Sequence, residues 1–243
     1  KPEPPLPQLK RLDKEIDVLP LMDPDRDSER GIWSLNKNTL SSPEGFGQAY
    51  LPTVVPEEYT LSMTVEMPAN APDHATMGIG LPVGRSICQL TIVNNDCMGI
   101  DTIDSRRWNE NDSRRSGTYL KRDAPTRIDC TVTKGRIRCE FNNRTLIDWR
   151  GESTRLSRPT DWFLADSRRL SLGAHHHLRF RDIKLGPPKA PPPLPDHPSF
   201  SVGQAVDLLA LVDPDRDAIN GKWERDGNSV VIAEGIGMSR LLI

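Results

Sequence analysis

The 243-residue sequence has no long apolar run, no excess of charge of one sign and none of the common catalytic motifs. No apolar stretch approaches the roughly 18 residues of a membrane-spanning helix, so membrane insertion is not expected. The net charge is −2 and both signs are scattered along the chain, which argues against a nucleic-acid or anionic-membrane partner. The signatures G-x-S-x-G and H-E-x-x-H and a phosphate-cradling glycine loop are absent.

The four cysteines lack the C-x-x-C spacing that zinc sites use, so a zinc site is not expected. No signal peptide is visible, but the sequence starts at Lys1 rather than Met, so this says nothing about export. An extracytoplasmic location is the working expectation.

The clearest feature that the sequence does have is a repeat. Residues 16–53 align without gaps with residues 206–243 at an offset of 190, and 15 of the 38 aligned positions are identical. The matches include the run from Asp23 to Asp27, and also Trp33, which aligns with Trp223. A period this long is typical of tandem domains and too long for a solenoid unit.

Prolines mark the expected boundaries, because 11 of the 22 lie in residues 1–7 and 187–198. The segments that begin at Lys1 and Lys189 look like the same semi-rigid spacer. We therefore expect a spacer at 1–15, a complete repeat at 16–187, a linker at 188–205 and the truncated start of a second repeat at 206–243. That last piece is too short to fold alone, so we expect its strands to pair with the first unit or with a neighbouring chain.

Strand signals dominate the complete repeat. Apolar and polar residues alternate over residues 59–67, the pattern of a half-buried antiparallel strand. Similar short runs separated by turn residues cover 87–93, 98–103, 127–133, 136–141, 169–173 and 178–185. Many short strands at this spacing predict an all-β sandwich or barrel.

The best local prediction is a hairpin around Lys134-Gly135. A two-residue loop that ends in glycine suits a tight turn, and pairing across it sets Cys130 opposite Cys139. Strands come closest at such a non-hydrogen-bonded pair, roughly 4.5 Å between Cα atoms, which lies within disulfide reach. A Cys130–Cys139 disulfide and a pair of packed free thiols both stay open.

Three motifs, in this order, resemble one family. They are Leu21-Met22-Asp23-Pro24-Asp25-Arg26-Asp27-Ser28-Glu29-Arg30-Gly31-Ile32-Trp33, then Phe141-Asn142-Asn143-Arg144-Thr145-Leu146-Ile147-Asp148-Trp149, and finally Phe180-Arg181-Asp182-Ile183. Over residues 16–187 the chain resembles the bacterial DUF1080 or 3-keto-disaccharide hydrolase domain, a relative of the concanavalin A-like lectins and glucanases. Its D-P-x-R-D variant looks like the tandem repeats of large planctomycete proteins.

This resemblance implies a fold and a binding face. The fold is an all-β, concanavalin A-like jelly-roll sandwich of two antiparallel sheets, whose concave face binds sugar in many relatives. Pro24 and Asn143 stand where the family has glycines, and no catalytic residue is carried over.

The alternating carboxylates Asp23, Asp25 and Asp27 suggest Ca²⁺, which binds six to eight oxygens. The other interpretation is a turn in which Arg26 pairs with a neighbouring carboxylate and an aspartate caps backbone N–H groups. Calcium is the only cofactor that the sequence suggests.

Six side chains are candidates for ligand binding. Trp108 lies in a polar stretch and is the best exposed aromatic for stacking on a sugar. Asp101, Glu110 and Asp112 could converge near it from loops. Every second side chain of an extended segment points the same way, which adds His175 and His177 as a pair. The other interpretation of these histidines is an exposed loop.

A retaining glycosidase needs two carboxylates about 5–5.5 Å apart, and the E-x-D-x-x-E strand of glucanases of this fold is absent. The leading prediction is therefore a non-catalytic binding module of a multidomain bacterial protein. Its partners would be a carbohydrate or protein ligand and neighbouring repeats. The alternatives are a glycoside-cleaving enzyme of the 3-keto-disaccharide hydrolase type and a purely structural array element.

Overall fold

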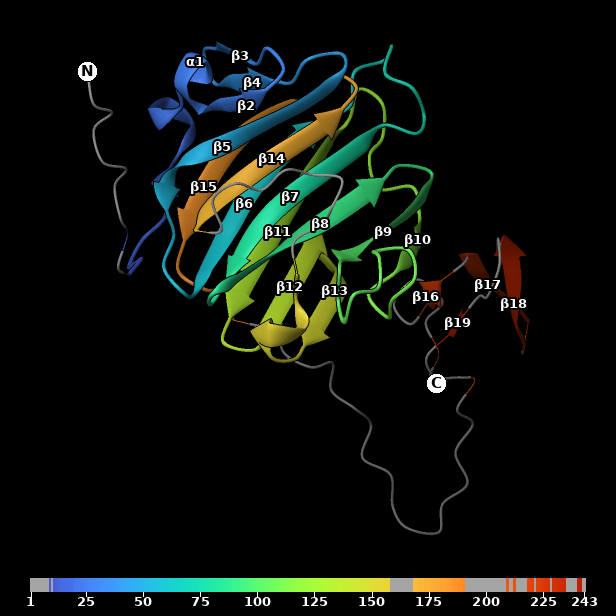
Figure 1. Ribbon diagram of the computed structural model, residues 1–243. Coiled ribbons are helices and arrows are strands. Elements are labelled where there is room, and N and C mark those ends of the chain that lie inside the picture. Colours follow the sequence, from blue (N-terminus) through green and yellow to red (C-terminus); the bar gives the residue numbers. More distant parts are fainter. Residues whose placement is uncertain are drawn as a thin grey trace. The chain divides into compact units, whose positions relative to one another are not determined.

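The computed structural model in Figure 1 describes residue 9, residues 11–157 and 168–190, and shorter stretches between residues 209 and 241. The chain divides into two compact units. The larger contains the described residues up to Arg114 and those from Thr118 to Lys189. The smaller contains strand β10 (Arg115–Gly117) and the described residues from Ala190 onward.

The larger unit is a sandwich of two sheets. The first sheet has the order β13-β12-β11-β6-β15-β4-β3, with β1 also pairing with β15. Its strands are β1 (Ile16–Asp17), β3 (Ser34–Asn36), β4 (Thr39–Ser41), β6 (Tyr59–Glu66), β11 (Pro125–Thr133), β12 (Arg136–Phe141), β13 (Arg144–Arg150) and β15 (Arg179–Gly186).

The second sheet of the sandwich has the order β9-β8-β7-β14-β5-β2. Its strands are β2 (Ser28–Arg30), β5 (Phe46–Val54), β7 (Thr76–Val83), β8 (Ser86–Val93), β9 (Asp96–Asp101) and β14 (Arg169–His175). Three short helical turns complete the unit: η1 (Leu19–Leu21), α1 (Pro24–Asp27) and η2 (Ser153–Arg155).

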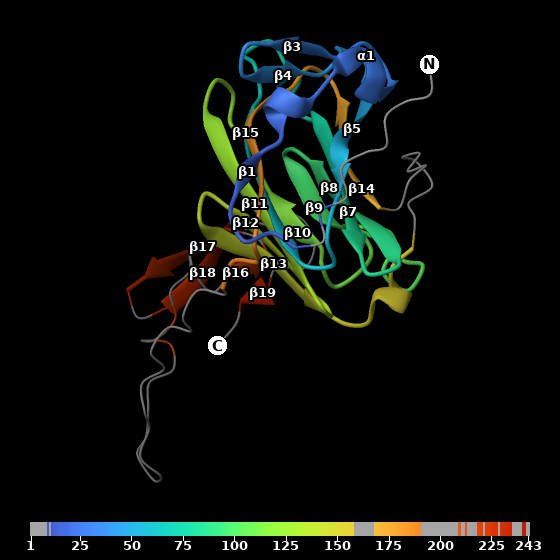
Figure 2. The same cartoon turned by 90° about the vertical axis from the view of Figure 1, so that its left-hand side faces the viewer.

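The chain repeatedly crosses from one sheet to the other. It passes from β5 in the second sheet to β6 in the first and back to β7, and again from β13 to β14 to β15. Figure 2 shows the two sheets as separate layers, and the pairs within them are antiparallel. This arrangement confirms the predicted all-β jelly-roll sandwich of two antiparallel sheets.

The core lies between the sheets and follows from the alternation of each strand. On β6, Tyr59, Leu61, Met63 and Val65 are fully buried in the core, as the pattern of residues 59–67 predicts. Tyr59 keeps its hydroxyl satisfied by donating to the Pro82 carbonyl at 3.0 Å. A buried donor without such a partner would cost about 1–3 kcal/mol.

The first and the last of the three motifs each place an aromatic side chain in the core. Trp33 is 4% exposed and its ring lies 5.8 Å from that of Phe180. Phe180 pairs with Val65 on one side and Leu40 on the other. The two ends of the predicted repeat therefore meet in one sheet.

The hairpin around Lys134-Gly135 is confirmed. Strands β11 and β12 pair Cys130 with Cys139 and Val132 with Ile137. Gly135 has a φ of +74°, which is why the turn needs glycine there. Both thiols are buried and free in this structure.

Two long strands, β5 and β7, were missed by sequence reasoning. Glycines and prolines interrupt both, for example Pro52, Gly78, Gly80 and Pro82. Such residues usually mark turns or edges, yet Pro82 sits in register opposite Ile87. Packing of the flanking apolar residues outweighs the local propensity here.

In the smaller unit, β16 (Ala218–Asn220) pairs with β19 (Arg240–Leu241), and β17 (Lys222–Asp226) pairs with β18 (Ser229–Glu234). The β17–β18 register joins residues 224–226 to 231–229. The β3–β4 register joins 34–36 to 41–39, which is the same pairing displaced by 190 residues. Lys37 and Gly227 begin the two turns with φ of +52° and +57°.

Candidate functional site

The outer face of the second sheet carries a row across five strands in which every residue but one glycine has a polar side chain. Register places Tyr50, Ser171, Gly80, Gln89 and Asp101 side by side on β5, β14, β7, β8 and β9. Their neighbours along each strand, such as Ile79, Leu90 and Ile100, point into the core. The row therefore faces away from the core.

A second row beside it is mostly glycine. Gln48, Gly173, Gly78, Thr91 and Gly99 are aligned on the same five strands. Glycine in a strand interior weakens the strand and commonly marks close approach of a ligand or another backbone.

Both rows are largely withdrawn from solvent. Gln48 and Gln89 are each 1% exposed, Ser171 is 2% and Tyr50 is 4% exposed. Buried polar side chains need partners: Gln89 donates to Thr91 at 3.1 Å, and the Arg169 guanidinium stacks 4.9 Å from the centre of the Tyr50 ring. The polar rows are thus ordered before any ligand arrives.

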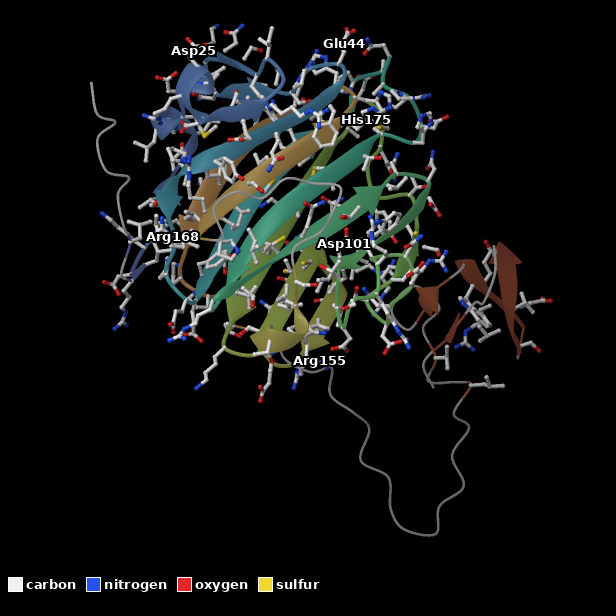
Figure 3. All side chains as sticks on the ribbon, viewed as in Figure 1. Asp25, Glu44, Asp101, Arg155, Arg168 and His175 are labelled. Carbon is white, nitrogen blue, oxygen red and sulfur yellow. The ribbon has the colours of Figure 1, made fainter. Side chains whose placement is uncertain are left out.

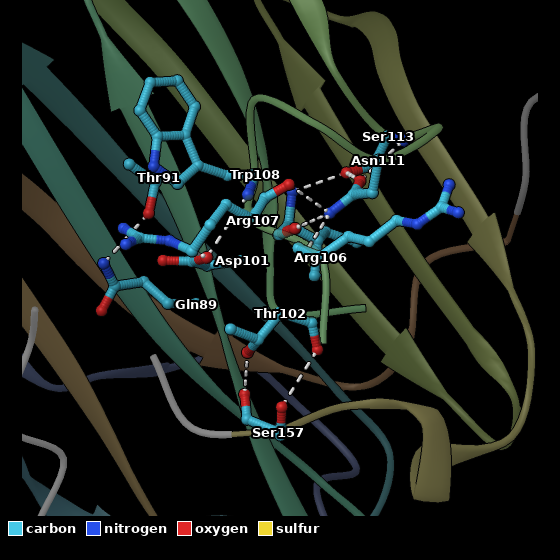
Figure 4. Close-up of polar contacts among 11 residues, drawn as sticks. Gln89, Thr91, Asp101, Thr102, Arg106, Arg107, Trp108, Asn111, Ser113 and Ser157 are labelled. Atoms are coloured by element: carbon cyan, nitrogen blue, oxygen red, sulfur yellow. Dashed lines mark hydrogen bonds and ion pairs between the residues drawn. The ribbon is translucent and has the colours of Figure 1, made fainter. Parts of the chain in front are cut away.

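The β9 end of the first row forms the most structured cluster (Figure 4). Asp101 is fully buried and accepts from Arg107 Nε at 3.1 Å and from the Trp108 backbone N–H at 3.3 Å. The Arg107 side chain is 34% exposed, and Trp108 is half-buried. The strand supplies a buried carboxylate, and the loop supplies a cation and an indole that reach solvent.

The loop after β9 is held on the strand by buried polar contacts. Asn111 Nδ2 donates to three carbonyls, those of Ile100, Arg106 and Arg107, at 2.8–3.2 Å. Ser113 Oγ accepts from the Ile100 N–H at 2.8 Å. These bonds fix the position of the segment that carries Arg107 and Trp108.

Gly99 makes room for this loop. A Cβ at Gly99 would lie 2.3 Å from the Trp108 carbonyl oxygen, closer than atoms can pack. In this row, therefore, the glycine on β9 is required by the approach of another part of the chain.

Of the four candidates at this end of the sheet, Asp101 and Trp108 come together. Glu110 and Asp112 lie on the same loop and are exposed, whereas Asp101 is fully buried. The buried carboxylate at this end of the sheet is that of Asp101, bound to Arg107.

The histidines lie elsewhere. His175 is exposed on the outer face in a third row, between Phe46 and Thr76, and Figure 3 shows it well away from Asp101. His176 has φ +85° and its ring lies 4.3 Å from that of His175 and 5.4 Å from that of His74. Burial and these two neighbouring imidazoles lower the pKa of His176. His177 is half-buried.

Asp23, Asp25 and Asp27 take separate roles. Asp23 caps α1 by accepting from the Asp25 N–H at 3.1 Å, and Asp25 is exposed. Asp27 is 2% exposed and paired with Arg26 and Arg169. Among the residues that the structure describes, no group of three His, Cys, Asp or Glu side chains could hold a metal ion. The arrangement is that of the capped turn and gives the calcium interpretation no support.

Sequence reasoning missed most of this face. Gln48 and Tyr50 lie in β5, which was not predicted as a strand. Gln89, Thr91 and Ser171 lie in predicted strands without any mark of a site, and Arg107 is one charge among many in a loop. Their shared feature is a position in cross-strand register, which a single sequence does not display.

No helix of the described chain is long and apolar enough to cross a membrane.

Comparison with known proteins gives structural likeness only. No family model matches the chain and no curated protein matches it, so the resemblance to the DUF1080 family stays a prediction. The carbohydrate-binding module CBM66 from Bacillus subtilis is 8% identical with a TM-score of 0.46, over 74% of this chain and 99% of that one.

Two further solved structures have similar values. The carbohydrate recognition domain of Emp47p is 11% identical with a TM-score of 0.49, over 73% of this chain and 96% of that one. A putative glycosyl hydrolase from Parabacteroides distasonis is 9% identical with a TM-score of 0.42, over 71% and 98%. Likeness at this level carries no information about ligand or activity.

Proposed function

We propose that the sandwich is a non-catalytic carbohydrate-binding module whose site is the β9 end of the outer face of the second sheet. The observation that carries this proposal is the buried polar row that ends in the Asp101–Arg107 pair beside Trp108. Sugars offer hydroxyl groups for such a pair and an apolar ring face for an indole. A ligand would meet Arg107 and Trp108 first, because these two are partly exposed.

Energetics support a role beyond folding for this row. Burying a polar side chain costs free energy unless it is hydrogen-bonded, and burying a charge costs more. If the only role of this row were to be covered by another segment, apolar side chains would serve without any need for hydrogen-bond partners. A preformed set of donors and acceptors is what a polar ligand requires, since ordered groups lose little entropy on binding.

A purely structural role is the second candidate. The four side chains Gln48, Tyr50, Gln89 and Ser171 are almost fully buried, which is also what a covered, permanently filled face would show. The two functions predict opposite results for Trp108, because only the binding module needs its partly exposed indole.

The glycoside-cleaving alternative needs a second carboxylate beside Asp101. Among the described residues of β5, β7, β8, β9 and β14, register places one carboxylate, Asp101, on the outer face. It is bound to Arg107, whereas a retaining glycosidase needs an acid and a nucleophile. We therefore do not propose hydrolysis.

The test is a glycan array followed by calorimetric titration of the best ligand. Loss of one aromatic stacking contact is worth about 1–3 kcal/mol, judged from base stacking on aromatic side chains, so Trp108→Ala should weaken binding at least about fivefold. Trp223→Ala is the matched control, since Trp223 belongs to the other unit, and it should bind as the parent does. No binding on the array, or equal binding by both variants, would refute the proposal.

A further inference from the structure

The outer face of the first sheet holds a polar cluster that the proposed sugar site does not use. Thr60, Thr131 and Arg138 are aligned on β6, β11 and β12, and Asp129 lies next to them along β11. These four residues are only 2–5% exposed, although they point away from the core. Something must cover them, and part of that cover is visible.

The cover is the chain that leaves the sandwich. After β15 ends at Gly186, Lys189 lies against the cluster and contacts three of its members. The Lys189 N–H donates to Thr60 Oγ1 at 3.0 Å, and the Lys189 carbonyl accepts from Arg138 Nη2 at 3.1 Å. Its ammonium lies 2.9 Å from Asp129 Oδ2. One residue is thus bound through its amide, its carbonyl and its side chain.

Charge in the cluster is arranged for a cation at this position. Burial alone would raise the pKa of Asp129, but hydrogen bonds from Ser62 and Lys189, together with the charge of Arg127, outweigh it and lower the pKa. Asp129 is therefore ionised at neutral pH. An ionised carboxylate that is 5% exposed needs charged partners, and both Lys189 and Arg127 are in contact with it.

We propose that Thr60, Asp129 and Arg138 form a lysine anchor, a docking site for the first residue of the proline-rich spacer of the same chain. The spacer then starts from a defined point on the repeat that precedes it, because Lys189 is held there. Proline content alone makes a segment stiff but does not determine where it starts or in which direction it leaves.

The sequence of the two spacers agrees with a dedicated lysine. Lys189-Ala190-Pro191-Pro192-Pro193-Leu194-Pro195 matches the segment that starts at Lys1 in its lysine, its second and third prolines of the run, its leucine and its last proline. A spacer that served only as a stiff rod would have no need for a lysine at that position. The anchor gives this lysine a function, which is independent of whether the second sheet binds sugar.

The Lys189–Ala190 bond supplies a direct assay, because trypsin cuts after lysine. Cleavage requires Lys189 to leave Asp129 and its backbone to leave Thr60 and Arg138, so the anchor should make this bond resistant in the full chain. Asp129→Asn should raise the cleavage rate at Lys189 by about tenfold or more, the loss expected for a charge-assisted hydrogen bond. Thr60→Val removes the acceptor of the Lys189 N–H, together with the hydroxyl contact to Thr131 within the cluster, and should raise it about threefold.

Cleavage after Lys14, which is exposed, serves as the internal standard for each variant, measured by mass spectrometry. Lys184→Ala is the matched control. It removes the lysine of β15, which is paired with Glu15 at 3.9 Å, and should leave the Lys189 rate unchanged. The proposal is overturned if the parent is cut after Lys189 as fast as after Lys14. It is equally overturned if Asp129→Asn and Thr60→Val both leave the ratio of the two rates unchanged.

Discussion

At the scale of single residues, the position of the loop after β9 is determined by one residue that has no side chain. Gly99 is such a position. The Trp108 carbonyl occupies the space that a Cβ would need, and the same Trp108 donates its N–H to the buried Asp101. One glycine on β9 therefore permits both the docking of the loop and the pairing of strand and loop.

We expect Gly99→Ala to destabilise the sandwich by about 1–3 kcal/mol, the usual cost of overpacking, and to weaken any ligand that contacts Trp108. Urea unfolding followed by tryptophan fluorescence measures the first effect. Gly45→Ala is the control, because a Cβ there meets nothing within 4 Å, and it should change stability by less than about 0.5 kcal/mol. Equal stability of the two variants would show that the loop does not lie on Gly99.

At the scale of elements, the β11–β12 hairpin determines the environment of the thiols. Cys130 and Cys139 face each other in the register that the sequence predicts, and both are fully buried. A hydrogen bond with Cys139 and burial raise the pKa of Cys130, and burial raises that of Cys88. The reactive thiolate form is therefore scarce at neutral pH.

The native protein should consequently react with Ellman's reagent far more slowly than a free cysteine at pH 7, and all four thiols should react once it is unfolded in guanidinium. A titre of two in the unfolded, unreduced protein would show instead that the chain holds one disulfide, which the register allows between Cys130 and Cys139. Mass spectrometry of alkylated peptides would identify the bonded pair.

At the scale of the whole molecule, the two outer faces of the sandwich differ in what they contact. One carries the polar rows and the Asp101–Arg107 pair, and the other carries the lysine anchor. Because Asp129 connects β11 with both Ser62 of β6 and Lys189, its ionisation contributes to the stability of the entire unit. This contribution has a defined pH dependence.

The pKa of Asp129 is lower in the folded than in the unfolded chain, so its stabilisation is fully present above the unfolded value, near pH 3.9. It is lost as the pH falls through the folded value. Asp129→Asn should therefore unfold more easily than the parent at pH 7, by about 1–3 kcal/mol, and the difference should shrink at pH 3. Asp13→Asn, whose pair with Arg11 is at least 80% exposed on both sides, should match the parent at both pH values.

Local patterns were enough for part of the fold. The alternation in residues 59–67 predicted β6 and its core face, and the Lys134-Gly135 turn predicted the β11–β12 register residue by residue. Both depend on short-range rules of side-chain period and turn geometry. The same rules did not predict strands β5 and β7, because both contain glycines and prolines. These residues are tolerated only once the sheet has formed.

The sequence by itself determined the all-β class, the hairpin register and the 190-residue offset, because each follows from neighbouring residues or from comparison of the chain with itself. Only the tertiary structure decided which polar residues stand together. Tyr50, Ser171, Gln89 and Asp101 form one row, and Thr60, Asp129 and Arg138 receive Lys189, through pairings between distant strands. Such pairings result from the packing of two sheets against a common core, which no local pattern encodes.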